Sequence, residues 1–431
     1  MKKTSLLLLI AMIAPFSLLA AGSGEDSGSG DSENVTVTIM SRWSEDMPSS
    51  RFFRNHLAEM DAADPSLTIV QDNINDEMAY YDKLRTKFAT GEFPNIFFNY
   101  GGSRLVDYVE SDVLVDMAPY LDADPTWKNG FQPVFDKWMY GEYSGIWGIP
   151  AEFYAVGIFY NKGIFAELGI ETPATMKEWE SACDKLLAAG YIPMALGEKD
   201  VWRAGHFSNN LIMKAYGAQA VSDLADRSMT YDDPKMIDIF EMIQDYNDRG
   251  YFGPNAVNMG GNMEKTSFHT GESAMHMDGS WYLSEASESP IFEQIGVFPF
   301  PAIEPAYAES WQGGAGGGFS VVDTGNRNEI DASVEIIKSI TIPSYMKQLQ
   351  TENKGGVYPV KFDPDESVVG HLTIEYMNML EDAEEYRDDV QTYDPISSLL
   401  ETVRLAIQGL FVGNTPDECA AEIVAEIEAA G

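Results

Sequence analysis

Aromatic and hydrogen-bonding side chains follow three stretches of this sequence that are apolar enough to form buried strands. Residues 35–40 are followed by Ser41, Arg42, Trp43, Ser44 and Glu45. Residues 67–70 are followed by Asp72, Asn73, Asn75 and Asp76, and residues 95–98 by Asn99, Tyr100, Gly101 and Arg104. Flat rings beside amide, carboxylate and guanidinium groups suit a ligand with apolar faces and a rim of hydroxyl groups. This combination favours binding of a sugar.

The sequence motifs that could indicate catalysis are each incomplete, unlike the residue pattern that indicates binding. Ser344 and Lys347 match the S-x-x-K nucleophile motif, but its partner motifs Ser-Asp-Asn and Lys-Thr-Gly are missing. The glycine-rich run 313–318 lacks the Lys-Ser/Thr of a phosphate loop and precedes a predicted strand, so its glycines are expected to allow close backbone approach. The 68 acidic residues show no spacing that selects a pair for glycoside cleavage. We therefore expect no catalytic residues.

Metal ligands and redox-active cysteines are not indicated either. The five histidines include no pair four residues apart, and no C-x-x-C motif occurs. Cys183 and Cys419 fall in step with apolar positions at helical spacing, which is typical of buried thiols. A disulfide between these two cysteines stays open as an alternative. We expect no cofactor and no metal site.

The elements that must position these residues alternate between strands and helices. The strands near residues 35, 67 and 95 are separated by two helical segments, which end at Pro65 and Gly91. Such alternation predicts an α/β fold built on a mostly parallel sheet. Later helices are predicted near 208–217, 234–249, 331–340 and 398–409, with capping boxes at Thr175/Glu178 and Thr415/Glu418.

The N-terminus has the layout of an export signal. Lys2 and Lys3 precede an apolar run over 6–19 and the small residues 20–22, so residues 1–21 are predicted to be a cleavable signal peptide. Residues 22–34 form a flexible linker rich in Gly, Ser and acidic residues. Because the first cysteine is Cys183, no cysteine is placed to carry a lipid anchor, and we expect a periplasmic or otherwise extracytoplasmic protein.

Net charge narrows the choice of partners, and length sets the number of domains. The chain carries a formal charge of -40, from 68 acidic and 28 basic residues. Repulsion from this charge argues against nucleic acid and anionic lipid surfaces as partners. The roughly 400 residues that follow the signal exceed what one hydrophobic core usually organises, so two domains are expected.

A series of short motifs resembles one known family over essentially the whole mature chain. Residues 148–178 contain the pattern G-I-P, Y-N-K-x-x-F-x-x-x-G-I-x-x-P-x-T-x-x-E almost intact. Further motifs follow the family order: Phe93-Pro94-Asn95-Ile96, Phe268-x-x-Gly271, Ala274-Met275, Gly279-Ser280-Trp281, Val297-Phe298-Pro299-Phe300-Pro301 and Thr415-Pro416-Asp417-Glu418. The chain closely resembles the family 1 extracellular solute-binding proteins, the maltose and multiple-sugar receptors of bacterial ABC importers.

The resemblance implies a periplasmic binding protein-like fold with two lobes, each with a central mostly parallel sheet flanked by helices. Crossover segments that join the lobes are expected near 149–156, 297–303 and 354–360. The N-terminal lobe would then comprise 35–150 plus 303–355, and the C-terminal lobe 151–302 plus 356–431. In such relatives the sugar lies between the lobes.

The resemblance also implies ligand-binding positions. They are Asn99, Tyr100 and Arg104 after the Asn95-Ile96 motif, Glu152 and Tyr154 after Pro150, Trp202, Arg203 and His206 after Gly197, Trp281, and Trp311 with Gly313 near the second crossing. The strand-end residues Trp43, Ser44, Glu45, Asn75 and Asp76 complete the predicted site. Asn95 replaces the family's aspartate and Asn99 stands where some members carry an aromatic residue, so the identity of the sugar stays open.

The expected function is capture of a sugar or oligosaccharide and its delivery to the transmembrane permease subunits of an ABC transporter, by a monomer that catalyses no reaction. A receptor for another solute is the main alternative. A polyamine could be held by the carboxylates of Glu45, Asp76 and Glu152. A glycerol phosphodiester is a second such solute, and a secreted glycosidase would use similar aromatic and acidic residues.

Overall fold

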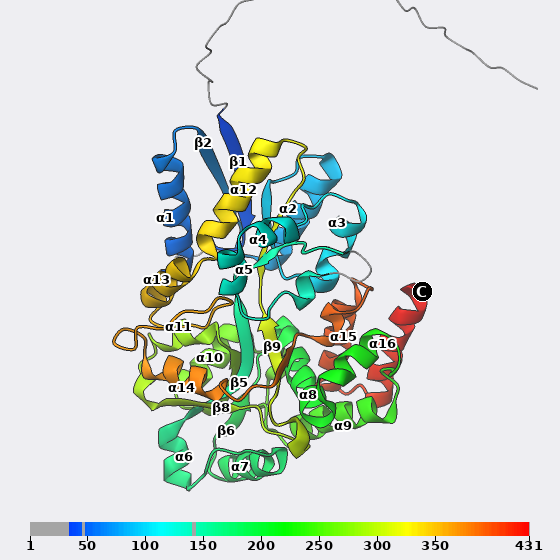
Figure 1. Cartoon of the computed structure of the whole chain (residues 1–431). Helices are drawn as coiled ribbons and strands as arrows, with labels where there is room; N and C mark the ends of the chain where they lie inside the picture. The colour runs from blue at the N-terminus through cyan, green and yellow to red at the C-terminus, as the bar shows by residue number, and fades with distance from the viewer. Residues whose placement is uncertain (1–33, 45–47, 140–143, 431) are drawn as a thin grey trace, which may run out of the picture.

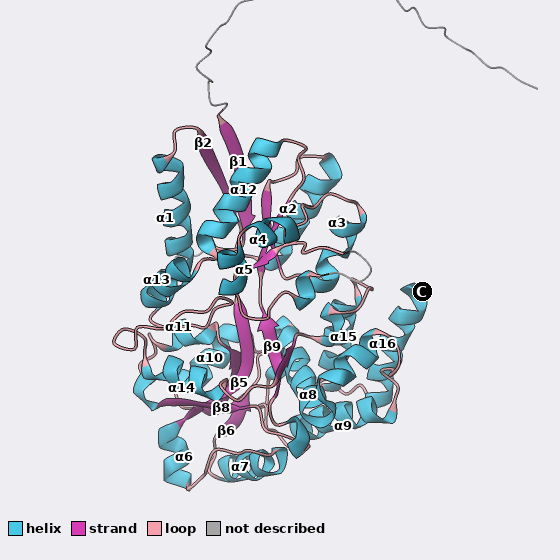
Figure 2. Ribbon diagram, viewed as in Figure 1, coloured by secondary structure: helices cyan, strands magenta, loops and turns pink. Residues whose placement is uncertain are grey.

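The computed structural model describes residues 34–44, 48–139 and 144–430. Two lobes lie one above the other, each with a central sheet flanked by helices (Figures 1 and 2). The predicted two-lobed α/β architecture is therefore confirmed. The predicted signal peptide, residues 22–33 of the predicted linker and the site candidate Glu45 lie outside the described residues.

The first lobe contains a five-stranded sheet in the order β2-β1-β3-β10-β4. Its strands are β1 (Val35–Ser41), β2 (Leu67–Asn73), β3 (Ile96–Asn99), β4 (Ile149–Pro150) and β10 (Gly318–Val321). Its helices are α1 (Pro48–Ala63), α2 (Glu77–Thr90), α3 (Val106–Glu110), α4 (Ala118–Ala123), α5 (Pro125–Gly130), α12 (Arg327–Ile340) and α13 (Pro343–Asn353), with the short 3-10 helices η1 (Gly102–Leu105) and η2 (Asp136–Trp138).

The second lobe contains a sheet in the order β11-β9-β5-β7-β6, and β8 also pairs with β5. Its strands are β5 (Phe153–Asn161), β6 (Ile192–Ala195), β7 (Ser273–Gly279), β8 (Ile295–Pro299), β9 (Ser310–Ala315) and β11 (Glu385–Arg387). Its helices are α6 (Lys162–Leu168), α7 (Met176–Ala188), α8 (Trp202–Ala225), α9 (Pro234–Asp248), α10 (Gly261–His269), α11 (Tyr282–Ala286), α14 (His371–Met379), α15 (Leu399–Leu410) and α16 (Pro416–Ala430). Short 3-10 helices are η3 (Glu198–Asp200), η4 (Ala256–Asn258), η5 (Phe292–Gln294), η6 (Pro305–Tyr307) and η7 (Val390–Thr392).

Both sheets are mixed, with more antiparallel pairing than the sequence pattern predicted. The strands β1, β2 and β3 are parallel, but β10 is antiparallel to β3 and to β4. In the second lobe, β5 is antiparallel to β7, β8 and β9. The direction of the crossovers accounts for two of these pairs, β4 with β10 and β5 with β9, because β4 and β5 lead the chain out of the first lobe while β9 and β10 bring it back.

The second crossing lies later in the sequence than the resemblance implied. Residues 313–315 of β9 still pair with β5, and Gly318 already pairs with β3 and β4 of the first lobe. We therefore propose a boundary at 316–317 in place of 297–303. The third crossing also shifts, because Lys361 N–H still donates to the carbonyl of Gly130, while α14 packs against β8 of the second lobe.

The glycine-rich run forms the second crossing and allows close backbone approach, as predicted. A Cβ atom on Gly318 would lie 2.3 Å from the carbonyl oxygen of Ile149, and one on Gly317 would lie 2.1 Å from Cζ of Phe98. Gly313 has the same role, since its Cβ would lie 2.3 Å from the carbonyl oxygen of Tyr154. These glycines let the two crossings run side by side.

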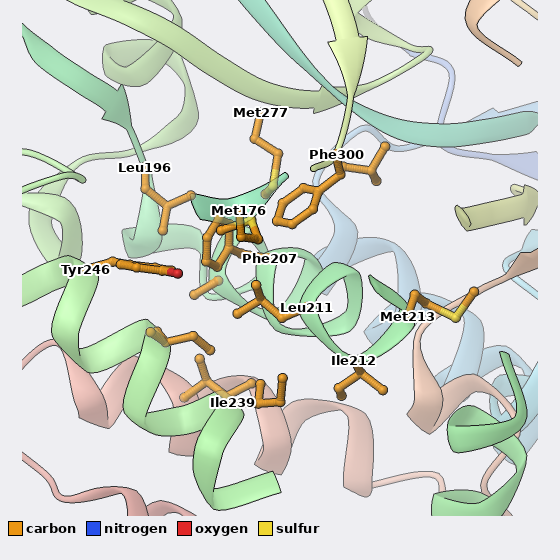
Figure 3. Packing of buried hydrophobic residues seen from close by; sticks show 14 of the residues in the cluster. Met176, Leu196, Phe207, Leu211, Ile212, Met213, Ile239, Tyr246, Met277 and Phe300 are labelled. Atoms are coloured by element: carbon orange, nitrogen blue, oxygen red, sulfur yellow. The ribbon is translucent and has the colours of Figure 1, made fainter. Parts of the chain in front are cut away.

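Each lobe has its own hydrophobic core, and the local signals read from the sequence form as predicted. The core of the second lobe gathers Phe207 and Leu211 of α8, Tyr246 of α9 and Phe300 (Figure 3). The Thr175/Glu178 capping box opens α7, and Thr415 and Glu418 exchange the same bonds before α16. Cys183 and Cys419 are buried free thiols, so the alternative of a disulfide is wrong.

Candidate functional site

A group of charged and aromatic side chains gathers at the carboxyl ends of β1, β2 and β3. Nη1 of Arg42 lies 2.8 Å from Oε2 of Glu77, and Nη1 of Arg104 lies 2.9 Å from Oε1 of the same carboxylate. Arg42 also donates to the hydroxyl of Tyr100. The guanidinium of Arg104 lies over the rings of Tyr100 and Tyr81, at 4.9 and 5.1 Å from their centroids. We call these five residues the first-lobe cluster.

The strands position this cluster directly. Arg42 follows β1, Glu77 is the first residue of α2, and Tyr100 and Arg104 follow β3, so parallel strands deliver them to one edge of the sheet. Burial would raise the pKa of Glu77, but the charges of Arg104 and Arg42 hold it below its usual value. Glu77 is thus an ionised carboxylate that orders both guanidinium groups.

Trp43 and Glu152 lie beside the first-lobe cluster. Trp43 packs edge to face on Phe53, with ring centroids 4.5 Å apart, and its side chain lies close enough to Glu152 to help lower the pKa of that carboxyl group. Oε2 of Glu152 accepts a hydrogen bond of 3.0 Å from the backbone N–H of Gly317 in the second crossing. Burial raises the pKa of Glu152, and hydrogen bonds and the charge of Arg42 oppose this shift only in part.

Four rings gather on the second lobe. The centroid of Trp281 lies 5.5 Å from Tyr154, 6.0 Å from Trp202 and 6.1 Å from His206. Trp202 and His206 come from the first turns of α8 and stand edge to face at 5.2 Å, whereas Trp281 follows β7 and Tyr154 belongs to β5. Trp281 is 44% exposed, an unusual amount for so large an apolar ring. We call these four residues the second-lobe cluster.

His206 is held in place by polar neighbours. Its Nδ1 meets the side-chain amide of Gln312, and the same amide donates to Asp389. Burial lowers the pKa of His206, while the charge of Asp389 acts in the opposite direction. An imidazole that accepts at Nδ1 is neutral and carries its proton on Nε2.

The two lobes contact each other next to both clusters. Lys137 of η2 forms an ion pair with Asp388, whose carboxylate also accepts a hydrogen bond from Tyr154. The hydroxyl of Tyr393 donates to Asp136 at 2.9 Å. The segment 388–393 of the second lobe therefore reaches across to the first lobe.

Arg404 of α15 lies near the contact between the lobes. It donates to Asp389 at 2.6 Å, and its charge helps to lower the pKa of Glu77 in the first-lobe cluster. Burial opposes ionisation of Asp389, but the charge of Arg404 and the hydrogen bonds from Arg404 and Gln312 lower its pKa below the usual value. Side chains from both lobes thus converge on one region.

Several residues of the predicted site lie elsewhere. Arg203 is 1% exposed and bound to carboxylates inside the second lobe, and Trp311 is fully buried under Lys214. Asn99 is buried and bonded to Ser320 and to the N–H of Gly101, which stabilises a turn. We assign structural roles to these three residues because each is at most 1% exposed.

The strand-end candidates Ser44, Asn75 and Asp76 are exposed. The carboxylate of Asp76 accepts from the N–H of Ala79 and so caps α2, and the carbonyl of Asn75 accepts from Arg42 at 3.2 Å. Gly313 contributes backbone to the pairing of β9 with β5. The structure therefore brings together Trp43, Tyr100, Arg104, Glu152, Tyr154, Trp202, His206 and Trp281 from the predicted set.

The predicted set lacked several residues of this region. They are Arg42, Glu77, Lys137, Gln312, Asp388, Asp389 and Arg404. For Arg42 and Glu77 the signal was present, since they follow the same strands as the residues that were chosen. Within the described parts of the chain, no group of three or more His, Cys, Asp or Glu is arranged to hold a metal ion.

Comparison with known proteins identifies the family. The model of the bacterial extracellular solute-binding proteins matches residues 65–332, which is more than half of the chain. The chain belongs to this family. No helix in the described ranges of this solute-binding protein is long and apolar enough to cross a membrane.

Individual relatives are distant. This solute-binding protein is 24% identical over 209 residues to a probable sugar-binding periplasmic protein of Mesorhizobium japonicum, a match that covers 47% of this chain and 48% of the relative. It is 23% identical over 164 residues to a multiple sugar-binding protein of Streptococcus mutans, covering 36% and 38% of the two chains. The chain therefore spans about half, or less, of the length of the curated relatives that it matches.

Solved structures share the fold over nearly the full length. A chitin oligosaccharide binding protein superposes with a TM-score of 0.82 at 24% identity, covering 92% of this chain and all of the other. A solute-binding protein in complex with raffinose superposes with a TM-score of 0.74 at 18% identity, covering 92% and 99%. A sugar transporter protein of Bacillus licheniformis in complex with stachyose gives a TM-score of 0.71 at 17% identity, covering 91% and 99%. At these identities the likeness establishes the fold.

Proposed function

We propose that this solute-binding protein captures a neutral sugar or oligosaccharide between its lobes and delivers it to the permease of an ABC importer. The observation that carries the proposal is the second-lobe cluster, in which the half-exposed Trp281 lies against Tyr154 and Trp202. Aromatic faces of this kind bind the C–H faces of a pyranose ring, and hydrophobic burial on each ring favours association.

Hydrogen-bonding groups complete the proposed site. Arg42, Arg104 and Tyr100 approach from the first lobe, and His206, Asp388 and Arg404 approach from the second. In His206 the proton on Nε2 supplies a donor for a hydroxyl group. A ligand that contacts both lobes stabilises the closed form through its higher affinity for that form.

The balance of charge supports a neutral ligand. Among the described residues that meet in this region, four basic side chains stand beside four acidic ones: Arg42, Arg104, Lys137 and Arg404, with Glu77, Glu152, Asp388 and Asp389. A glycerol phosphodiester would need a cation free to pair with it, but each of these cations already faces a carboxylate. A polyamine would need free carboxylates, but Asp76 caps α2 and Glu77 lies between two arginines.

The same contacts support binding without catalysis. Glu152 accepts from Gly317, Asp388 binds Lys137 and Tyr154, and Asp389 binds Arg404, so each of these carboxylates has a structural partner. General acid and base catalysis of glycoside cleavage requires two carboxyl groups that face the scissile bond. We further propose that the protein is exported by its N-terminal signal, acts outside the cytoplasm as a monomer and is recognised by the permease in its closed form.

A thermal-shift screen tests the proposal. The purified mature protein is heated with mono- and oligosaccharides, spermidine and glycerophosphodiesters, and the sugars are analysed by chromatography after incubation. Stabilisation by one sugar that is recovered intact is the expected result, because a ligand that binds only the native state raises the melting temperature. Stabilisation by spermidine or a phosphodiester alone, or cleavage of the sugar, would overturn the proposal.

A further inference from the structure

Four charged side chains form a closed group inside the second lobe, directly beneath the aromatic rings. They are Arg203 of α8, Glu264 of α10, and His276 and Asp278 of β7, and each is at most 1% exposed. Nε of Arg203 lies 2.9 Å from Oε2 of Glu264, and its Nη1 lies 2.9 Å from Oδ1 of Asp278. His276 lies between the same two carboxylates, at 2.9 Å from Glu264 and 3.0 Å from Asp278. We call these residues the buried quartet.

The short contacts of both ring nitrogens favour a protonated His276. A neutral imidazole has one ring nitrogen without a proton, and that lone pair would face the lone pairs of a carboxylate. Nε2 is hydrogen-bonded to Asp278, and Nδ1 lies 2.9 Å from Glu264 without the alignment of a hydrogen bond, so the positive charge of an imidazolium suits both carboxylates. With Arg203 it supplies two positive charges against two negative ones, so the buried quartet is neutral as a whole.

Arg203 connects the buried quartet to Trp202. The central carbon of the Arg203 guanidinium lies 4.0 Å from the centroid of the Trp202 ring, which is close contact for a cation over an aromatic face. Arg203 is fixed on its other side by Glu264, Asp278 and the carbonyl of Met277. The position of the Trp202 ring therefore depends on where the two carboxylates hold the guanidinium.

Asp278 connects the buried quartet to Trp281 through the turn after β7. Oδ1 of Asp278 accepts a hydrogen bond of 2.9 Å from the N–H of Gly279, which shapes the turn after β7. The indole of Trp281 folds back over this turn so closely that a Cβ atom on Gly279 would lie 2.4 Å from the ring. Asp278 in turn is oriented by His276 and Arg203.

We propose that His276 is a positioning residue for the sugar site, which as an imidazolium holds Glu264 and Asp278 and through them sets the rings of Trp202 and Trp281. This inference rests on the proposed function for the role of the two rings. Loss of the His276 proton leaves a net negative charge in the buried quartet, so Arg203 is pulled toward one carboxylate and away from its place over Trp202.

Other titratable groups around the quartet belong to three elements. Glu198 of η3 and Asp200 face Arg203 and Glu264, and His269 of α10 and Tyr282 of α11 face His276. Burial would lower the pKa of His276, but the charges of Glu264 and Asp278 raise it above its usual value. A raised pKa means that the proton, and with it the ring geometry, is kept to a higher pH than on an ordinary histidine and is lost as the pH rises further.

Fluorine NMR of protein labelled with 5-fluorotryptophan tests the proposal without any ligand. The resonances of Trp202 and Trp281 are assigned with W202F and W281F. At pH 7 the H276Q variant should move both resonances, and R203K, which keeps the charge but not the flat guanidinium, should move that of Trp202. H371Q, a change on α14 of the same lobe, is the control and should move neither. Unchanged resonances of both rings in H276Q would overturn the proposal.

If H276Q does not fold, a pH titration of the wild-type protein tests the same proposal. Nitrogen-15 NMR of labelled histidine follows the proton on His276 while the fluorine resonances are recorded over the same pH range. The two ring resonances should change with the midpoint of His276, and rings that stay in place while His276 loses its proton would overturn the proposal. Calorimetry with raffinose should show about tenfold weaker binding to H276Q. Failure of the wild type to bind any sugar would count against the proposed function, whereas equal binding by H276Q would count only against the role of His276.

Discussion

Lys137 and Asp388, 251 residues apart in the sequence, form an ion pair that joins the two lobes. The Lys137 side chain is almost fully buried and that of Asp388 is 12% exposed. The same carboxylate accepts from Tyr154 of the second-lobe cluster, so the contact between the lobes and the aromatic rings share one residue. Closure and ligand binding are therefore expected to be coupled through Asp388.

Replacing Lys137 by Met should shift the protein toward the open form. The change leaves the Asp388 carboxylate without its cation in a poorly hydrated place, at a cost of about 1 to 3 kcal/mol to the closed form. Sugar affinity should fall about tenfold or more in calorimetry, and small-angle X-ray scattering should show a larger radius of gyration at the same sugar concentration. K128M is the control, since Lys128 pairs with Asp122 on the surface of one lobe. Equal compaction of K137M and wild type would show that the pair does not contribute to closure.

Replacing Trp281 by Ala should weaken sugar binding with little effect on folding. The ring is 44% exposed, so its removal costs little core packing, but it takes away the aromatic surface that lies against Tyr154 and Trp202. We expect a loss of about 1 to 3 kcal/mol, or roughly ten- to a hundredfold in affinity, measured by calorimetry. W281F keeps an aromatic face and should retain most of the affinity. Binding by W281A at the wild-type level would remove Trp281 from the site.

The first-lobe half of the candidate site could be predicted because it depends on local features. Tyr100 and Arg104 follow a buried strand, and parallel neighbours place such residues at one edge of the sheet. The capping boxes of α7 and α16 were predicted for the same reason, since both partners of each lie within four residues. Patterns over a short stretch of sequence specify contacts over a short stretch of chain.

The second-lobe half depends on contacts that no short pattern specifies. Arg203 and His206 both lie on the first turns of α8. Arg203 nevertheless points inward, because it forms ion pairs there with Glu264 of α10 and Asp278 of β7. Trp311 lies in a strand whose glycine-rich end gives no alternation of polar and apolar residues, so its buried face could not be predicted. Asp388 and Arg404 come late in the chain and reach the site only through the third crossing.

Replacing Gly317 by Ala should destabilise the second crossing. The added Cβ would lie 2.1 Å from Cζ of Phe98 and 2.8 Å from Oε2 of Glu152, so both side chains must move. Overpacking of this kind costs about 1 to 3 kcal/mol, which chemical denaturation can measure. G130A is the matched control, because its nearest neighbour would be Cγ of Pro343 at 3.8 Å, an ordinary contact. Equal stability of G317A and G130A would show that the crossing has room for a side chain.

Glu198 is expected to make the stability of the second lobe depend on pH. Its side chain is fully buried, Oε2 accepts a 2.7 Å bond from the N–H of Ala204 near the start of α8, and Oε1 has no hydrogen-bond partner within the described structure. Burial raises the pKa of Glu198 to about 8. A folded-state pKa above the unfolded value means that the stabilising contribution is complete below the unfolded pKa of 4.5 and is lost as the pH rises toward 8.

The E198Q variant should therefore lose less stability than the wild type as the pH rises. Glutamine imitates the protonated carboxyl group and cannot ionise, so it removes a slope of up to about 1.4 kcal/mol per pH unit between the two pKa values. The free energy of unfolding, measured by denaturation at several pH values from 5 to 8.5, should differ increasingly between the two proteins as the pH rises. E198Q should be the more stable of the two at the alkaline end of this range. E92Q is the control, since Glu92 lies exposed on the first lobe and its curve should follow the wild type. If E198Q instead follows the wild type across the whole range, Glu198 is not protonated in the folded protein near neutral pH, and burial beside α8 does not decide its charge.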